Sequence, residues 1–210
     1  MPDKFSAVTG AAAPLLRPNI DTDTIAPAHS EKEFGEKGAS TLSRNLFAGW
    51  RYSEKGEEIL DFILNRPEFR EAKILLAGHN FGCGSSRESA VWMLRQWGIR
   101  CVIAPSFGEI FYNNCFKNGM LPLLLPESTV RELAEEAEPG APRALFTVDL
   151  TANSLTTPSG RVVEFELPNF LRQGLLEGLD EIKLTLRREG EISEFVAQAR
   201  RARPWAYFGR

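Results

Sequence analysis

The chain has 210 residues, of which 43% are hydrophobic and 25% are charged, a composition typical of a soluble globular protein. Its formal net charge of -3 excludes a strong overall attraction to nucleic acid or to an anionic membrane. No apolar stretch approaches the roughly 18 residues that a membrane-spanning helix requires. We therefore expect a cytoplasmic protein whose partner is a small molecule or another protein.

Residues 35–43 are the first segment with a distinctive composition. They are polar and include two glycines, so we expect a mobile loop that extends, with its flanks, over about residues 28–43.

The most regular part of the chain runs from residue 73 to residue 126. Short apolar runs alternate there with helical patterns, in the order 74–77, 90–97, 101–104, 107–117 and 121–125. This alternation predicts a parallel β-α-β-α-β core with right-handed crossovers.

The carboxyl-terminal third follows a different pattern. Residues 146–149 and 162–165 alternate in polarity around a Ser159-Gly160 turn, which predicts an antiparallel pair in a β-rich layer beside the core. We expect residues 135–143 to form a surface connection and about 179–210 to form a helical tail. The basic and aromatic end of that tail could suggest contact with nucleic acid, but a solvated or partner-facing tail is the preferred interpretation. The whole chain is thus predicted to be one α/β domain, residues 1–210.

Three cysteines, Cys83, Cys101 and Cys115, are too widely spaced for a disulfide scaffold. Three thiolates could in principle hold an iron-sulfur cluster. However, Cys101 opens an apolar run and Cys115 lies on the apolar stripe of a predicted helix, which favours buried thiols. The sequence therefore predicts no metal site in this chain.

A glycine-rich turn carries the main chemical signal. Residues 80–88 read NFGCGSSRE and lie between a buried strand and a helix start, where unpaired N–H groups and the helix dipole favour an anion. Gly82 and Gly84 let the backbone approach a ligand, and Arg87 offers a planar donor fork for a carboxylate.

A second interpretation of the same turn is purely structural. Ser85 is followed three residues later by Glu88, a spacing that matches a capping box. A capping box alone would explain why both residues stand at a helix start. From spacing alone, the anion site and the helix cap both remain open.

The NFGCGSSRE stretch resembles the signature of the swivelling domain of aconitase-type hydro-lyases, in particular the small subunits of isopropylmalate dehydratases. Further stretches agree in the same order: NIDTDTI at 19–25, LFAGWR at 46–51, IAPSF at 103–107, Asn113-Asn114 and NGMLP at 118–122. The similarity spans roughly residues 5–190 and implies a swivelling β/β/α domain of the aconitase type.

The resemblance also implies a reaction, the reversible removal and re-addition of water on a 2-alkylmalate through an alkylmaleate in leucine biosynthesis. Ser85 would be the base that removes the C–H proton, while Arg87 and the Ser86 region would hold a substrate carboxylate. Asp23 would help to organise the site, although without the resemblance it is interpreted as a turn or cap residue. A serine alkoxide needs stabilisation near pH 7, for which Arg87 and helix-start amides are suitable.

The family's Lewis acid is an iron-sulfur cluster (4Fe-4S) with one open iron, held by a separate large subunit. The resemblance therefore implies no cofactor bound by this chain, a heteromeric partner and an active site between subunits.

The chain departs from the family pattern at two places. After Pro27 the family usually has a basic residue and an apolar pair, whereas this segment is polar, so His29 or Lys32 would replace the basic contact. Ser89 stands where the family commonly has histidine. The first departure leaves open another substrate, of the methylmalate/citraconate or homoaconitate type. Rivals from other classes are a stand-alone anion- or nucleotide-binding module and a non-catalytic scaffold.

Overall fold

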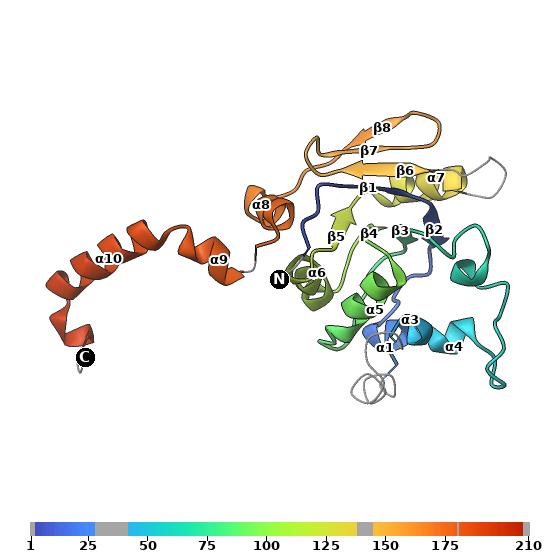
Figure 1. The fold of residues 1–210 in the computed structure, drawn as a ribbon, viewed down its shortest axis with the longest axis horizontal. Helices are drawn as coiled ribbons and strands as arrows, with labels where there is room; N and C mark the ends of the chain where they lie inside the picture. Colours follow the sequence, from blue (N-terminus) through green and yellow to red (C-terminus); the bar gives the residue numbers. More distant parts are fainter. Residues whose placement is uncertain (1–2, 28–41, 138–144, 180, 208–210) are drawn as a thin grey trace.

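A computed structural model describes residues 3–27, 42–137, 145–179 and 181–207 of the chain (Figure 1). Most of the loop that was predicted over 28–43 lies outside these residues. Its last two positions belong to a short helix, α3 (Leu42–Asn45).

A parallel sheet forms the centre of the fold. Its four strands are β2 (Ala12–Leu15), β3 (Ile74–Ala77), β4 (Cys101–Ala104) and β5 (Leu121–Leu124), in that spatial order. Helices α5 (Ser89–Trp97) and α6 (Glu109–Lys117) connect the last three strands. The predicted β-α-β-α-β core is therefore confirmed, and β2 extends it by one parallel strand that periodicity did not reveal.

A second, antiparallel sheet lies beside the first. Its strands are β1 (Ala7–Gly10), β6 (Phe146–Asp149), β7 (Ser154–Thr156) and β8 (Val162–Glu164), again in that order. The β-rich layer is confirmed, but the predicted direct pairing of 146–149 with 162–165 is wrong. The short strand β7 lies between them, because Asn153, at φ 52°, turns the chain back after only a few residues. The Ser159-Gly160 turn joins β7 to β8.

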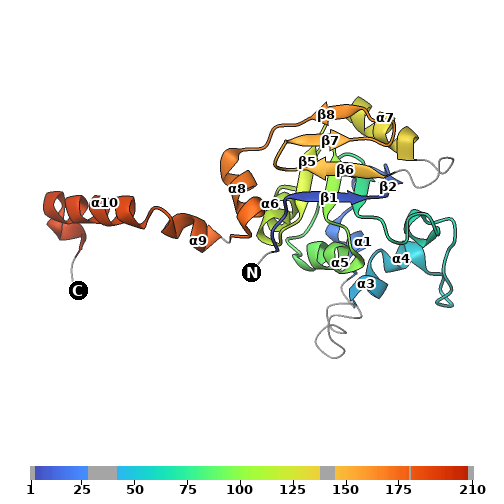
Figure 2. The same ribbon diagram turned by 45° about the horizontal axis from the view of Figure 1, so that its top comes forward.

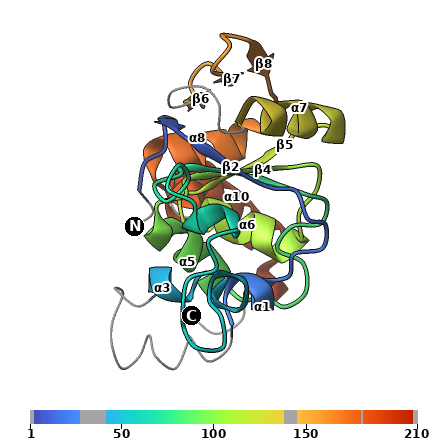
Figure 3. The same cartoon turned by 90° about the vertical axis from the view of Figure 1, so that its right-hand side faces the viewer.

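The two faces of the parallel sheet bury separate cores, and Figure 3 shows the resulting layers. Ile74 and Leu76 of β3 pack toward the antiparallel sheet, whereas Leu75 and Ala77 pack toward α5 and α6. A strand buried on both faces accounts for the continuous apolar runs in the sequence.

Helix α7 (Glu127–Ala137) lies on the same side as the antiparallel sheet. Its buried face is formed by Val130, Leu133, Ala134 and Ala137. The predicted surface connection at 135–143 is therefore wrong for its first three residues, because Ala137 continues the apolar stripe of this helix.

Short helices complete the body. They are α1 (Thr22–Ile25), α4 (Ala48–Arg51) and the 3-10 turn η2 (Ile63–Asn65). The Arg51 guanidinium is buried in this region and donates to Asn65 Oδ1 (3.0 Å) and to the Leu46 carbonyl (3.3 Å). Burial lowers the pKa of Arg51, so the stretch LFAGWR contains a structural arginine.

The carboxyl-terminal part consists of α8 (Asn169–Glu177), α9 (Glu181–Leu186), α10 (Glu189–Ala202) and the 3-10 turn η3 (Pro204–Ala206). Figures 1 and 2 show α9 and α10 extending away from the two sheets. Phe195 and Trp205 are 62% and 63% exposed on this arm. Among the described residues, no helix has the length and apolarity needed to cross a bilayer.

Candidate active site

The glycine-rich turn continues from the carboxyl end of β3 and is held between two other segments. On one side, Gly82 N–H donates to the Ile20 carbonyl (2.7 Å) and Thr22 N–H donates to the Cys83 carbonyl (2.9 Å). On the other side, Phe81 N–H donates to the Ser106 carbonyl (3.1 Å). These bonds bring together three of the stretches on which the family resemblance rests, although they lie far apart in the sequence.

Gly82 and Gly84 have different roles in this turn. Both have positive φ, 72° and 89°, a conformation that side chains disfavour. Gly82 is buried, and a Cβ there would collide with the Phe111 ring, so its small size serves packing. Gly84 is exposed and has only ordinary contact with Asp21. Close approach of the backbone to a ligand therefore remains a prediction, and it fits Gly84 better.

The Asp-Thr-Asp motif at 21–23 places each side chain in a different environment. Asp21 is the N-cap of α1, and its Oδ1 accepts from the Thr24 N–H at 2.6 Å. Hydrogen bonds from Thr24 lower the pKa of Asp21. Thr22 is only 1% exposed and points toward the glycine-rich turn, whereas Asp23 is exposed. The capping role proposed as an alternative for Asp23 thus belongs to Asp21.

The alternative interpretation of Ser85 and Glu88 as a capping box is wrong. Helix α5 begins only at Ser89, and its N-cap residue Glu88 makes no side-chain cap. Glu88 instead accepts from Asn118 Nδ2 at 2.7 Å. The Ser85 hydroxyl is exposed and lies 2.8 Å from the buried Thr22 Oγ1, which also donates to the Ser85 carbonyl at 3.1 Å. A tertiary contact across 63 residues therefore replaces the local one, and Ser85 is free of a capping role.

Arg87 and Asp23 form an ion pair at the same edge. Arg87 Nη2 lies 2.7 Å from Asp23 Oδ1, and the Arg87 side chain is 26% exposed. Its Nη1 is buried and has no hydrogen-bond partner among the described residues. A guanidinium donor without a partner costs free energy, and an added carboxylate oxygen would remove that cost.

The structure describes some of the remaining residues that the sequence singled out, but not all of them. Ser86 is exposed between Ser85 and Arg87. Ser89, which replaces the family's usual histidine, is buried at the first position of α5. His29 and Lys32 lie outside the described residues.

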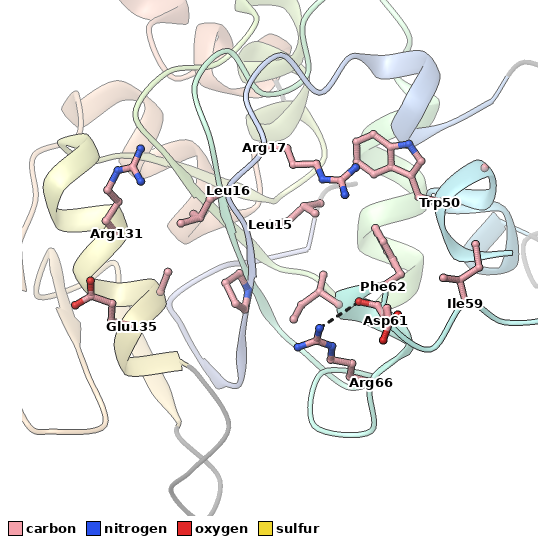
Figure 4. A pocket seen from close by; sticks show the side chains of 14 residues that line it. Leu15, Leu16, Arg17, Trp50, Ile59, Asp61, Phe62, Arg66, Arg131 and Glu135 are labelled. Carbon is pink, nitrogen blue, oxygen red and sulfur yellow. Dashed lines mark hydrogen bonds between the residues drawn. The ribbon is translucent and has the colours of Figure 1, made fainter.

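A large groove of the described surface is separate from these residues. It has a volume of about 740 Å³ and lies between α7 and the segment that contains Trp50 and Phe62 (Figure 4). Arg17 stacks on Trp50 at one wall, with 4.9 Å between its guanidinium carbon and the ring centre, and Arg131 with Glu135 forms the other wall. None of Asp23, Ser85, Ser86 and Arg87 lines it. Asp23, Ser85 and Ser86 are exposed and the Arg87 side chain is 26% exposed, so the candidate residues lie on an open edge of the described surface.

The three thiols do not fit an iron-sulfur cluster in this chain. Cys101 and Cys115 are fully buried in the two separate cores, and burial raises the pKa of each thiol. Cys83 is half-buried in the glycine-rich turn. Among the described residues, no three His, Cys, Asp or Glu side chains could jointly hold a metal ion.

Sequence reasoning missed Thr22. It lies within the quoted NIDTDTI stretch, but no local pattern links its hydroxyl to Ser85. The sequence offered one signal: the stretches NIDTDTI and NFGCGSSRE both contain hydroxyl residues next to charged ones. That signal does not specify which side chains are in contact.

Comparisons with known proteins identify the family to which the chain is similar. The family described as the aconitase C-terminal domain matches residues 2–128. A 3-isopropylmalate dehydratase small subunit from Roseobacter denitrificans is 51% identical over 97% of this chain and 99% of the relative, and one from Paracoccus denitrificans matches equally well.

A solved structure adds independent support for the fold. The crystal structure of the 3-isopropylmalate dehydratase LeuD from Methanocaldococcus jannaschii superposes with a TM-score of 0.62 at 25% identity, over 90% of this chain and 98% of that one. The predicted α/β swivelling fold is thereby confirmed. From its sequence, its two-sheet fold and these relatives, the chain belongs to the aconitase superfamily, in the family of 3-isopropylmalate dehydratase small subunits.

Proposed function

We propose that this chain, paired with a large subunit, interconverts 2-isopropylmalate and 3-isopropylmalate through isopropylmaleate in cytoplasmic leucine biosynthesis. One observation carries the proposal. The Ser85 hydroxyl and the Arg87–Asp23 pair share one exposed edge of a chain that is about half identical, over nearly its whole length, to curated small subunits.

Ser85 is the proposed base. Its Oγ, as an alkoxide, takes the proton from the carbon beside the one that bears the hydroxyl, and the C–H electron pair forms the double bond as hydroxide leaves. Water then adds across the double bond in the opposite sense, and Ser85 returns the proton to the other carbon. The same group therefore serves both halves of the isomerisation.

Thr22 is the proposed positioning residue for this base. Its buried hydroxyl lies 2.8 Å from Ser85 Oγ and 3.1 Å from the Ser85 carbonyl, so it restricts both the side chain and the backbone of Ser85. While Ser85 is protonated, either oxygen can be the donor in this contact. Once Ser85 has lost its proton, only Thr22 can donate, and a hydrogen bond from Thr22 to Oγ would favour the anionic form. This contact supports the assignment of Ser85 as a group whose protonation state matters.

Arg87 is the proposed carboxylate ligand, with Ser86 as a neighbouring donor. Asp23 Oδ1 lies 2.7 Å from Nη2 and restrains the guanidinium, while Nη1 lacks a partner among the described residues. A planar fork that is already oriented binds a carboxylate with less entropy loss than a free side chain. His29 or Lys32 remains the proposed replacement for the family's basic substrate contact after Pro27.

The large subunit completes the proposed site. When bound there, a 4Fe-4S cluster would supply the Lewis acid for the leaving hydroxyl. The thiols of this chain are unsuited to be ligands of that cluster, because two of the three are buried and have raised pKa values.

Co-purification with candidate iron-sulfur large subunits, followed by an anaerobic hydratase assay, tests the proposal. We expect turnover of 2-isopropylmalate by the assembled enzyme, and neither turnover nor stoichiometric iron in the isolated chain. Stable assembly without hydratase activity on any alkylmalate would contradict the proposed reaction.

Substrate preference requires a second arm of the assay. The polar segment after Pro27 departs from the family pattern and is compatible with another alkylmalate. We therefore compare kcat/KM between 2-isopropylmalate, 2-methylmalate and a homoaconitate-type acid. A higher value for either of the latter two would keep the chemistry and replace the proposed substrate.

A further inference from the structure

A basic groove lies at the amino end of the parallel sheet, the opposite end from the candidate active site. It has a volume of about 500 Å³ and is lined by residues 4–9, Lys73, Arg95, Gly98 and Arg100. Four of its lining side chains are cationic, Lys4, Lys73, Arg95 and Arg100, and none is anionic. The chain as a whole has a net charge of -3, so this groove is a local reversal of sign.

The cations of the groove are poorly neutralised. Asp3 lies beside them and is shared by Arg95 (2.6 Å) and Arg100 (3.4 Å). Lys4 and Lys73 have no ion-pair partner among the described residues. Burial and then the nearby Arg100 lower the pKa of Arg95, and its Nε is buried without a hydrogen-bond partner. Positive charge therefore accumulates where part of the solvent has been removed.

Lys73 is built into the groove by the backbone around it. Its aliphatic stem packs against Gly10, and its ammonium lies beside Gly98, so that a side chain at either glycine would meet Lys73. The carboxyl end of α5, which Gly98 terminates, favours nearby cations, but a helix end carries only about half an elementary charge. The helix dipole therefore explains the position of one cation and does not balance four.

An unpaired strand edge borders this groove. Strand β1 pairs only with β6 and is the first strand of its sheet. Leu150 N–H donates to the Ser6 carbonyl (2.8 Å), and antiparallel alternation then directs the backbone groups of Ala7 and Thr9 away from β6. Outside the pairing of β1 with β6, no backbone hydrogen bond between described residues reaches Ala7 or Thr9.

We propose that this groove binds an extended acidic segment of another protein, which adds to the free edge of β1 and places its carboxylates against Lys4, Lys73, Arg95 and Arg100. Backbone bonds to Ala7 and Thr9 would supply the register, and the cations would select acidic side chains.

Charge disfavours two occupants that the chain itself could supply, a second β1 edge and the end of the carboxyl-terminal arm. A second copy that paired through its own β1 would bring two basic grooves together, at a cost in repulsion. The end of the carboxyl-terminal arm is also basic, with Arg200, Arg201 and Arg203. An acidic segment of a different protein is the occupant whose charge complements the groove.

Fluorescence anisotropy with labelled short peptides tests the proposal on the full-length chain, alone and assembled with its large subunit. The probes are an alternating glutamate-threonine peptide, the same peptide with alternate backbone nitrogens methylated, a lysine-threonine peptide and, as an unlabelled competitor, inorganic pyrophosphate. We expect only the unmethylated acidic peptide to bind, with salt-dependent affinity and with shifted NMR amide signals of Ala7 and Thr9.

Variants locate the binding. Lys4→Glu and Lys73→Gln should each weaken the acidic peptide about tenfold, whereas Arg161→Gln, at an ion pair remote from the groove, should not. Lys4 is exposed, so its variant should fold even if the half-buried Lys73 is needed for stability. Loss of probe binding on assembly would identify the large subunit as the source of the segment and would support the proposal.

Three results would overturn it. Equal binding of the methylated peptide would show attraction by charge without strand addition. Displacement by pyrophosphate with no amide shifts at Ala7 or Thr9 would indicate a small-anion site. Absence of binding by the acidic peptide would indicate a different role for the cations, namely to prevent aggregation through the open strand edge.

Discussion

The two ends of the parallel sheet carry different arrangements of charge. At the carboxyl end, Arg87 is paired with Asp23 and the Ser85 hydroxyl is bonded to Thr22, so the groups that we propose to be reactive have partners within the chain. At the amino end, two lysines have no ionic partner in the described chain and two arginines share Asp3. Fixed partners define the geometry that a reaction needs, whereas a surplus of one charge attracts an oppositely charged ligand.

The same comparison shows that the proposed active site does not coincide with either of two large grooves. Neither the groove of about 740 Å³ beside Trp50 nor the basic groove of about 500 Å³ is lined by Asp23, Ser85 or Arg87. An edge that a second chain covers is not a cavity in either chain alone.

Ser85→Ala is the change with the largest expected effect on this comparison. Turnover of the assembled enzyme should fall by about 10²- to 10⁴-fold, because the proposed proton acceptor is removed. Unfolding stability should change by less than about 0.5 kcal/mol, since Ser85 is exposed and does not cap α5. Steady-state kinetics and thermal melting of the same variant give both values.

Ser159→Ala is the matched control for Ser85→Ala. Ser159 is also exposed and hydrogen-bonded, to Glu136 at 2.8 Å, but it lies in the turn between β7 and β8. Near-normal turnover in both variants would remove Ser85 from the proposed mechanism.

Arg87→Lys should have the next largest effect. An ammonium cannot keep Asp23 and also present a planar pair of donors to a carboxylate, so we expect kcat/KM to fall about 10- to 100-fold, mainly through a higher KM. The control is Arg161→Lys, which also replaces an arginine that is ion-paired, to Glu132 at 2.6 Å. Indistinguishable kinetics for the two variants would show that positive charge alone is sufficient at position 87.

Thr22 offers a finer test, because two substitutions separate its hydroxyl from its shape. Thr22→Val keeps the volume and removes the hydrogen bonds to Ser85, so we expect about tenfold slower turnover and about 1 kcal/mol of lost stability. Thr22→Ser keeps the hydroxyl and should recover most of the rate. If the valine variant lost stability without a change in rate or in its pH profile, Thr22 would be structural only.

Substitution of Asp21 should have the smallest effect, a loss of unfolding stability that depends on pH. Hydrogen bonds from Thr24 hold the pKa of Asp21 below its usual value of 3.8, so the cap stabilises the fold when the carboxylate is ionised. That contribution is present above about pH 4 and is lost as the pH falls through the lowered pKa. Asp21→Ala should therefore cost about 1 kcal/mol at pH 7 and progressively less in acid. An equal cost at pH 7 and pH 3 in chemical denaturation would contradict this origin.

The sequence by itself determined the central architecture. The runs at 74–77, 101–104 and 121–124 are apolar without alternation because both faces of the parallel sheet are covered, and that pattern is local enough to recognise. The family stretches likewise identified the edge where Asp23, Ser85 and Arg87 meet.

Only the tertiary structure decided what those side chains contact. The cap predicted for Ser85 obeyed a local rule, but the Thr22 hydroxyl, 63 residues away in the chain, is its partner, and α5 begins later than the rule required. The basic groove likewise assembles Lys4, Lys73 and Arg100 from three separate segments. Propensities act over a few neighbouring residues, whereas a hydrogen bond or a shared charge depends on distances that packing of the whole chain sets.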